Sequence, residues 1–402
     1  MQNSFVTKSD TPLGKSIFFL FCMIFSTLIW VKLGIPVAVF KLTIADGLLV
    51  LLLGYLLVFR LLYISKDYIP FLAVQASFIF LSGISIFEAK SKFAGLITLL
   101  PFLYALLLTI VTFHIFSRAD ERHFIILRNL FCAVLLASDI PVYLEVLGGM
   151  EFPSLHPDGW RYAFVTLNPN QYATYAYMAV FVIMQITEKY KKNQLSLMLL
   201  LSVFTILPVM NSGSKTGLGT ILAATFLLLY LVIKNVSYVS KAIIAFVVFV
   251  TITQIIFFLD DILALSPFIA RSFEIFDLVG SGAKTSDLSD TGQSMVVGIQ
   301  IFLLHPLLGI GLGNFIFYNE FEVHNTFIGA LAETGLIGFT SLIAVFGVII
   351  FHVLKSGTND MKFKLLQLSQ LMIFFATCYG HQPIRERWTW IFFAFIFTLS
   401  KK

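Results

Sequence analysis

The stretch HNTFIGALAETGLIGF, residues 324–339, begins the longest apolar segment of the chain, residues 325–354. It opens with a titratable side chain, His324, and an amide, Asn325. A carboxylate, Glu333, follows among apolar residues, just before Gly335 and Gly338. Lipid accepts such residues only where another group compensates them, and ionisable residues in membrane segments usually serve a function. The stretch therefore predicts a membrane helix with a functional, polar end.

The whole chain has the composition of a membrane protein. Of its 402 residues, 58% are hydrophobic and only 12% are charged. A soluble domain of this length cannot bury that much apolar surface, so the solvent of most helices must be lipid. The fold class predicted is all-α and polytopic, with about twelve membrane helices near residues 16–33, 43–62, 69–87, 94–117, 124–147, 169–187, 194–212, 216–233, 241–259, 325–354, 365–380 and 388–400.

The positive charges indicate the orientation of these helices. With this set of segments, 17 of the 27 Lys and Arg residues fall on one side, mostly in short loops, and that side also holds both termini. An excess of Lys and Arg marks cytoplasmic loops. Both termini are therefore expected in the cytoplasm, with the other set of loops outside.

The outer side carries one long segment, residues 260–324, within a single membrane domain of residues 1–402. Its stretch SMVVGIQIFLLHPLLGIGL is interrupted by Pro306 and Gly309 and is too short for a clear membrane span. It is expected to form an amphipathic or re-entrant helix at the outer interface.

Charged residues and histidines gather at this outer level, which makes them candidates for chemistry. They are Arg161, Lys215, Arg271, His305, His324, Arg385 and Arg387. Taken singly, an outer Arg more often anchors the protein to headgroups, and His305 before Pro306 fits a structural role. Several cations and a histidine at one level favour a binding site instead. The chain shows no basic and aromatic pattern for nucleic acid, and Cys22, Cys132 and Cys378 have unrelated spacings that predict neither a disulfide nor a metal site.

Two successive motifs carry a resemblance to a known family. HPLLGIGLGNF (305–315) followed by HNTFIGALAETGLIGF (324–339) resembles the O-antigen polymerase and ligase family, the Wzy and WaaL superfamily. NPNQYA (168–173) and the Ser-Lys-Thr-Gly turn (214–217) also look like family landmarks. The resemblance covers the second half of the chain and hardly touches the first third.

The resemblance implies a bacterial inner-membrane protein of the GT-C type. Such a protein is an inverting glycosyltransferase without cofactor or metal, and its active site faces the outside. Its donor is an oligosaccharide on undecaprenyl diphosphate, and its acceptor is a sugar hydroxyl. Membrane lipid and a chain-length regulator protein are the expected further partners. The chain departs from the pattern at two positions, with Lys215 and Gln293 where relatives often carry Arg.

The chemistry of glycosyl transfer assigns roles to the candidates. Fixed cations stabilise the negative charge that grows on the leaving diphosphate, which suits Arg161, Lys215 and Arg271, with Arg385 and Arg387 as further candidates. Histidine has a reference pKa of about 6.5 and suits proton removal from the acceptor, so His324 is the predicted general base. Asn325 is expected to cap the helix or to bind sugar.

Glu333 is predicted to be structural. It lies about 13 Å from His324 along a continuous helix, too far to share the acceptor's proton. Packing, or polar support of the core, is therefore its expected role. His305, Gly309 and Gly311 are likewise assigned to structure.

Several functions remain open at this stage. The departure at Gln293 favours a polysaccharide polymerase acting in O-antigen, capsule or exopolysaccharide synthesis, over a ligase that transfers glycan to lipid A core. A lipid-linked oligosaccharide flippase is the alternative of another class, and broken helices with charges at mid-membrane would favour it. A purely structural membrane component explains the outer cluster least well.

Overall fold

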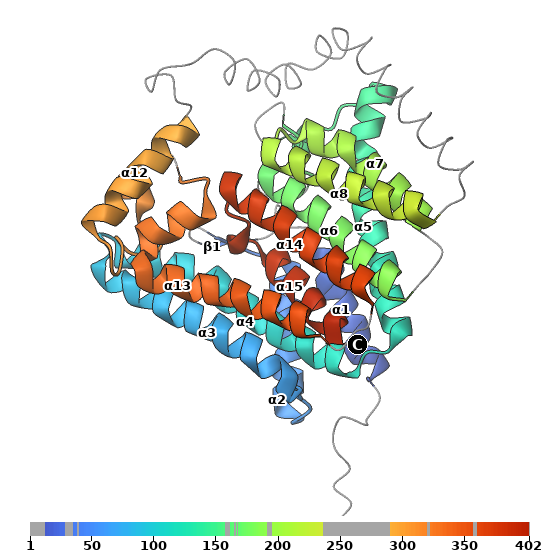
Figure 1. Ribbon diagram of the computed structural model, residues 1–402, viewed down its shortest axis with the longest axis horizontal. Helices are drawn as coiled ribbons and strands as arrows, with labels where there is room; N and C mark the ends of the chain where they lie inside the picture. Colours follow the sequence, from blue (N-terminus) through green and yellow to red (C-terminus); the bar gives the residue numbers. More distant parts are fainter. Residues whose placement is uncertain are drawn as a thin grey trace, which may run out of the picture. The chain divides into compact units, whose positions relative to one another are not determined.

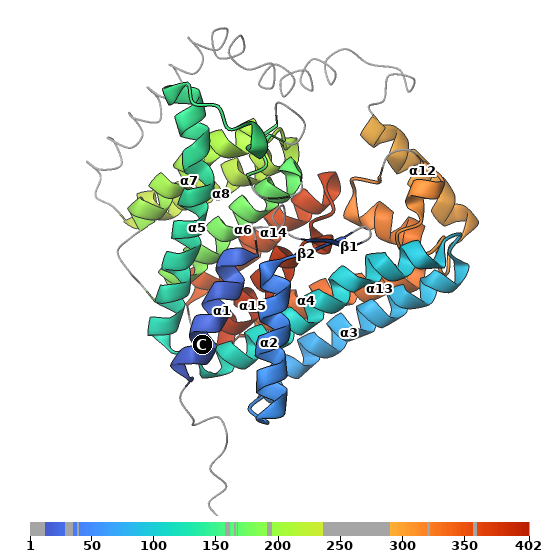
Figure 2. The same cartoon turned by 180° about the vertical axis from the view of Figure 1, so that it is seen from behind.

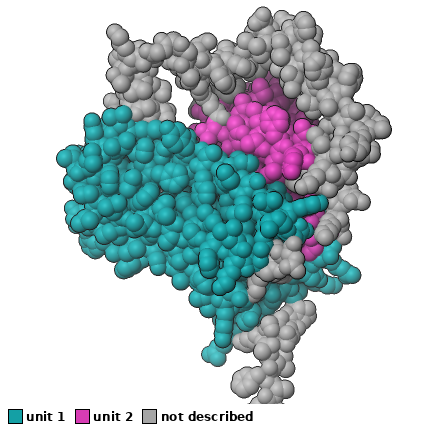
Figure 3. Space-filling model, in the orientation of Figure 1, with its two compact units in different colours: residues 1–131, 289–402 teal, residues 132–288 magenta. Residues whose placement is uncertain are grey.

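The computed structural model describes residues 13–28, 35–37, 40–156, 161–164, 166, 168–190, 195–235, 290–319, 322–356 and 360–401. Contacts divide the chain into two compact units (Figure 3). Unit 1 comprises residues 1–131 and 289–402, and unit 2 comprises residues 132–288. One long helix, α5 (Glu121–Gly148), contributes residues to both. The predicted single membrane domain stays a prediction.

Unit 1 is built from helices and one short strand pair. Before α5 come α1 (Lys15–Thr27), β1 (Ile35–Val37), β2 (Phe40–Leu42), α2 (Ile44–Val58), η3 (Lys66–Tyr68), α3 (Ile69–Ile84), η4 (Ser85–Glu88) and α4 (Lys92–Arg118). The later elements are α12 (Asp290–Leu304), η7 (Phe315–Phe317), α13 (Thr326–Lys355), α14 (Met361–Gly380), η8 (Pro383–Arg385) and α15 (Arg387–Lys401). The two strands pair antiparallel, with Ile35 opposite Leu42.

Unit 2 contains the rest of α5, followed by η5 (Pro153–Leu155), α6 (Pro169–Lys189), α7 (Leu195–Asn211) and α8 (Lys215–Asn235). A buried carboxylate, Asp139 of α5, binds two of its neighbours. Tyr172 of α6 and Thr205 of α7 donate to it at 2.5 and 2.8 Å. The predicted span 241–259 lies outside the described residues, as do residues 260–289 and 320–321 of the predicted outer segment 260–324.

The apolar helices are those of a membrane protein. Among the described residues, four helical stretches are long and apolar enough to cross a bilayer: Lys66–Glu88, Lys92–Arg118, Glu121–Gly148 and Thr326–Lys355. Each predicted span other than 241–259 overlaps a helix, although α1, α2 and α15 are shorter than a bilayer requires. The helical class is thus confirmed, whereas the count of twelve spans stays a prediction.

Local polar residues fix where several helices begin. Thr43 and Asp46 form a capping box at the start of α2, with the Thr43 N–H donating to Asp46 at 2.6 Å. Ser91 accepts from the Ala94 N–H at the start of α4. Asn325 accepts from the N–H groups of Phe327 and Ile328 at 2.9 and 3.0 Å, and so caps α13.

The core of unit 1 is aromatic and lies between helices far apart in sequence. Helix α13 lies beside α3, and α3 lies beside α4 in both views (Figures 1 and 2). The buried ring of Phe395 in α15 contacts Phe116 of α4 and Phe131 of α5, with centroids 4.7 and 5.9 Å apart. These contacts hold α15, which ends the chain, against helices from its first third.

Helix α13 is broken at Gly335, where φ is 61° and ψ is −164°. The break leaves carbonyl groups before it and N–H groups after it without helical partners. The loop after α12 occupies this position. Ile310 and Gly311 donate their N–H groups to the carbonyls of Ala332 and Glu333, at 3.0 and 2.9 Å. In the other direction, Leu336 donates to the Pro306 carbonyl at 2.8 Å.

The predicted interfacial helix therefore ends earlier than expected. Helix α12 stops at Leu304, and His305 and Pro306 begin a loop whose backbone completes the hydrogen bonding of α13. Non-helical backbone within apolar surroundings is stable where protein groups satisfy it in this way. The loop and the break together position the site.

Candidate functional site

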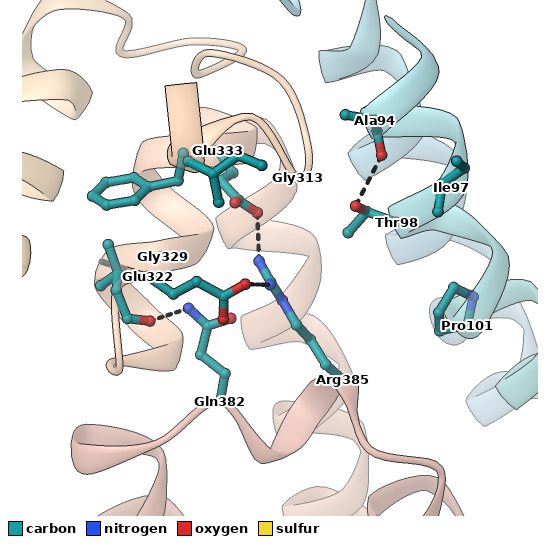
Figure 4. A pocket seen from close by; sticks show the side chains of 13 residues that line it. Ala94, Ile97, Thr98, Pro101, Gly313, Glu322, Gly329, Glu333, Gln382 and Arg385 are labelled. Atoms are coloured by element: carbon teal, nitrogen blue, oxygen red, sulfur yellow. Dashed lines mark hydrogen bonds and ion pairs between the residues drawn. The ribbon is translucent and has the colours of Figure 1, made fainter. Parts of the chain in front are cut away.

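An ion pair lies beside the break in α13. Arg385 of η8 donates from Nη2 to Glu333 Oε2 at 2.8 Å (Figure 4). Its Nη1 lies 3.9 Å from Glu322 Oε1. Burial lowers the pKa of Arg385, but Glu333 and Glu322 outweigh this and raise it, so the guanidinium stays charged. Glu333 is therefore paired, in keeping with a structural role, but its partner comes from a turn 52 residues away.

This ion pair lines a cavity of about 330 Å³ in unit 1. Its walls come from α4, from the loop after α12, from the start of α13 and from the turn before α15 (Figure 4). The described lining residues are Ala94, Ile97, Thr98, Pro101, Gly313, Phe315, Ile316, Glu322, Val323, Gly329, Glu333, Gln382 and Arg385. The volume is at the lower end of the roughly 300–1,000 Å³ of small-molecule sites, which are likewise mostly apolar with a few convergent polar groups.

Hydrogen bonds restrain the turn that carries Arg385 on both sides of this residue. Gln382 donates from Nε2 to the Val323 carbonyl, and Thr326 donates to the His381 carbonyl at 2.8 Å. Trp390 of α15 donates from its indole nitrogen to the Ile384 carbonyl at 3.1 Å. These bonds fix the guanidinium at the cavity, because they restrain the backbone on either side of it.

His324, the predicted general base, is half-buried and directly precedes the cap Asn325. It follows the lining residue Val323, but the described residues that line the cavity do not include it. Its neighbour His381 has a pKa lowered to about 4, first by burial and then by the nearby His324 and Arg385. His381 is thus neutral near pH 7, and its buried Nε2 has no hydrogen-bond partner in the described structure.

Arg387 is placed away from the ion pair of Arg385. It pairs with Asp46 of α2 at 2.8 Å, and its guanidinium lies 4.4 Å from the centre of the Tyr104 ring. Both partners tie the start of α15 to α2 and α4. Although Arg387 is a further candidate for diphosphate binding, this geometry gives it a structural use.

In unit 2 the structure brings Arg161 to the turn that precedes Lys215. The guanidinium of Arg161 donates to the Ser212 carbonyl at 3.0 Å and to Asn170 Oδ1 at 3.1 Å. The N–H of the next residue, Tyr162, donates to the Asn211 carbonyl at 2.9 Å. Arg161 therefore links NPNQYA, through Asn170, to the residues directly before the Ser-Lys-Thr-Gly turn.

Lys215 begins α8, two residues after Gly213, which has a φ of 73°. Ser214 accepts from the Gly217 N–H at 3.1 Å and so satisfies one N–H of the first turn. The N-terminus of a helix attracts anions, which suits the predicted role of this turn. Arg271 lies outside the described residues, as does the side chain of Gln293.

The structural assignments of Gly309 and Gly311 now have a physical reason. Their φ values are 67° and 92°, a region that favours glycine. A Cβ on Gly309 would lie 2.5 Å from the carbonyl carbon of Glu333, and one on Gly311 would lie 2.5 Å from Cβ of Ala89. His305 has an exposed side chain, and its carbonyl accepts from the Gly309 N–H at 3.0 Å.

Sequence reasoning missed the polar lining residues Thr98, Glu322 and Gln382. Glu322 is two residues before His324, and Gln382 is three before Arg385, so proximity to a candidate was the available signal. The sequence contains no signal for Thr98, because a single threonine in an apolar helix is common. Among the described residues, no group of three or more His, Cys, Asp or Glu side chains could hold a metal ion.

In comparisons with known proteins, the chain matches no family model and no curated protein. The functional conclusion therefore depends on the chain's own residues and on the resemblance of its two motifs.

Proposed function

We propose that this protein is a membrane-embedded, metal-independent inverting glycosyltransferase that polymerises oligosaccharide units carried on undecaprenyl diphosphate. One observation carries the proposal. The two motifs that resemble the polymerase and ligase family contribute adjoining walls of one cavity, through Gly313 and Phe315 from the first and Gly329 and Glu333 from the second. A catalytic role for these motifs requires such a shared site.

The proposed roles follow from the chemistry of the transfer. Arg161 and Lys215 stabilise the negative charge that develops on the leaving diphosphate. His324 takes the proton of the acceptor hydroxyl, as its position beside the cavity residue Val323 allows. The Glu333–Arg385 pair holds the cavity wall, in keeping with the structural role proposed for Glu333.

The proposal places the protein in the bacterial inner membrane, with both termini in the cytoplasm and the site facing outward. The apolar helices support the membrane location, and the bias of Lys and Arg supports the orientation. A GT-C arrangement with about twelve spans belongs to the same proposal. A chain-length regulator protein is the expected protein partner.

A reconstituted reaction tests the proposal. Purified protein in liposomes, given only the repeat unit on undecaprenyl diphosphate, should form a ladder of polymers and release undecaprenyl diphosphate in step with it. His324→Ala should remove both products, whereas Leu336→Ala, at an exposed position of α13, should retain them. Absence of polymer and of released carrier from folded protein, with the strain's own repeat unit supplied, would contradict the proposal.

The acceptor separates polymerase from ligase. A second reaction supplies lipid A core beside the same donor. A polymerase extends the lipid-linked repeat whether or not core is present, whereas a ligase yields product only with core. The sequence departure at Gln293 supports the first outcome.

A lipid-linked oligosaccharide transporter is the second candidate, and the break in α13 favours it. Transporter sites often use discontinuous helices with charged residues at the break, as Glu333 and Arg385 are here. A fluorescent lipid-linked oligosaccharide in sealed liposomes distinguishes the two. Movement between leaflets without bond formation would favour the transporter, and polymer formation with the donor added outside would favour the enzyme.

A further inference from the structure

The cavity of unit 1 has an unusual balance of charge for a protein expected to bind diphosphate. Its described lining residues include one guanidinium, Arg385, and two carboxylates, Glu322 and Glu333. The guanidinium already donates to Glu333 at 2.8 Å and lies 3.9 Å from Glu322. An anion entering the cavity would approach two negative charges, and its attraction to Arg385 would compete with bonds already formed. The cavity therefore disfavours anions.

The same groups suit the hydroxyls of a sugar. A carboxylate accepts several hydrogen bonds, so Glu333 can accept from a hydroxyl while it keeps Arg385. The Arg385 Nη1 is beyond hydrogen-bond distance of Glu322, at 3.9 Å, and can donate to a sugar oxygen. A hydroxyl both donates and accepts, which matches a wall that offers both kinds of group.

The remaining walls suit the apolar faces of a sugar ring. Phe315 and Ile316 come from η7, and Ile97 and Pro101 come from α4. Figure 4 shows Ile97 and Pro101 on the helix that faces Arg385. An apolar wall opposite a polar one fits a flat molecule whose edge is polar and whose face carries C–H groups.

We propose that this cavity binds an uncharged sugar ring, the acceptor end of the glycan, and excludes both the diphosphate and acidic sugars. That the bound sugar is the acceptor rests on the proposed function. The preference for neutral over anionic ligands rests on the cavity alone. It gives Glu333 and Arg385 a binding role beyond the support of the core. It also separates Arg385 from the cations proposed to bind diphosphate.

Direct binding tests this preference without any transfer reaction. The protein is placed in lipid nanodiscs free of sugar detergent, and saturation-transfer NMR measures binding of the methyl glycosides of glucose, galactose, rhamnose and N-acetylglucosamine. Methyl glucuronide and inorganic pyrophosphate serve as the anionic probes. At least one neutral glycoside should bind, and the two anions should bind about tenfold more weakly or not at all, because they approach two carboxylates and compete with these for Arg385.

Two kinds of variant assign the signal to the cavity. Ala94→Phe fills it from α4 and should abolish glycoside binding, whereas Leu96→Phe, at a position 55% exposed on the same helix, should leave binding unchanged. Glu322→Gln with Glu333→Gln leaves Arg385 as the charged lining group. Pyrophosphate binding should then appear while glycoside binding falls about tenfold.

The outcomes are distinct. Binding of pyrophosphate to the unmutated cavity as tight as that of any glycoside, and lost in Ala94→Phe, would overturn the inference. So would failure of every neutral glycoside to bind folded protein. Polymer formation without glycoside binding at the cavity would refute this inference and leave the proposed function standing. Glycoside binding at the cavity without polymer formation would support this inference and contradict the proposed polymerase function, because the binding assay reports on the cavity alone.

Discussion

Removing either member of the Glu333–Arg385 pair should destabilise the folded protein, but by unequal amounts. The side chain of Glu333 is 6% exposed and that of Arg385 is 26% exposed. Arg385→Gln leaves a buried carboxylate without its charged partner, which costs about 3–5 kcal/mol. Glu333→Gln leaves a guanidinium that reaches solvent and still has Glu322 3.9 Å away, so its cost should be about 1–2 kcal/mol.

A second pair in the same unit provides a matched control. Asp46 and Arg387 also lie 2.8 Å apart, with side chains 7% and 21% exposed. After Arg387→Gln, however, Asp46 keeps the hydrogen bonds from the Thr43 N–H and hydroxyl, at 2.6 and 2.9 Å. Arg387→Gln should therefore cost about 1–3 kcal/mol, less than Arg385→Gln, because Asp46 Oδ2 keeps both hydrogen bonds and only Oδ1 loses its partner.

The assay is reversible unfolding in mixed detergent micelles, followed by circular dichroism for all variants under one condition. Arg385→Gln should show the largest loss, and adding Glu333→Gln to it should recover part of that loss, because the buried charge is then removed. Asp46→Asn should leave glycoside binding unchanged, since it does not line the cavity. If Arg385→Gln proves no more destabilising than Glu333→Gln, the reasoning from unequal burial is wrong.

Four further outcomes are expected. His324→Ala should reduce polymer formation by roughly 10²–10⁴-fold at unchanged protein level, and His305→Ala should reduce it only as far as protein level falls; near-normal polymer from His324→Ala would end the general-base assignment. Arg161→Ala should reduce the transfer rate by about 10²-fold, and an unchanged rate at equal expression would remove it from the site. A cysteine at position 284 should be labelled from outside the cell, and labelling from the cytoplasm alone would reverse the topology. Burial lowers the pKa of His381 to about 4, whereas in the unfolded chain a histidine has a pKa of about 6.5 and takes up its proton first. Stability should therefore fall as pH drops from about 6.5 to 4, and His381→Asn should flatten that slope; an unchanged slope in the variant would assign it to other groups.

The helices could be predicted from the sequence because their cause is local. A run of apolar residues ends where a charge, a proline or a capping residue appears, and these features set the bounds of α13 and α14 within a few residues. The break in α13 could not be predicted in this way, because Gly335 interrupts the helix without interrupting the apolar pattern. The strand pair β1 and β2 was missed for a related reason: three residues per strand are too few to show a period.

The candidate site was predicted in part. Arg161 and the turn before Lys215 were singled out separately, and in the structure Arg161 donates a hydrogen bond to that turn. Polar groups at helix ends in apolar surroundings usually form hydrogen bonds with one another, because no water satisfies them there. The pairing of Glu333 with Arg385 was not predicted. It depends on where η8 lies beside α13, which no local pattern contains.

The distance argument that separated Glu333 from His324 assumed a continuous helix at 1.5 Å per residue. Helix α13 begins only at Thr326 and is regular from there to Glu333, so His324 lies before the helix, next to the lining residue Val323. The cavity wall follows the chain from Val323, before the cap of α13, through Gly329 to Glu333 within the helix. A sugar chain is long enough to contact both ends of such a wall, although a single proton cannot pass between them. Glu333 can therefore belong to the binding site without taking part in the proton transfer proposed for His324.

The glycines of GIGLGN, Gly309, Gly311 and Gly313, are explained by the close packing of this loop against its neighbours. From the sequence, Gly309 and Gly311 were assigned to structure without a contact that requires a glycine at either position. In the structure, Gly309 and Gly311 let the loop backbone approach α13 and η4 closely, and Gly313 faces Thr98 of α4 across the cavity wall. Each has a positive φ, so an L side chain there would be strained as well as crowded. The motif thus allows a loop to supply the hydrogen bonds that the broken helix lacks. The break in turn keeps Glu333 in the last turn before Gly335, facing Arg385.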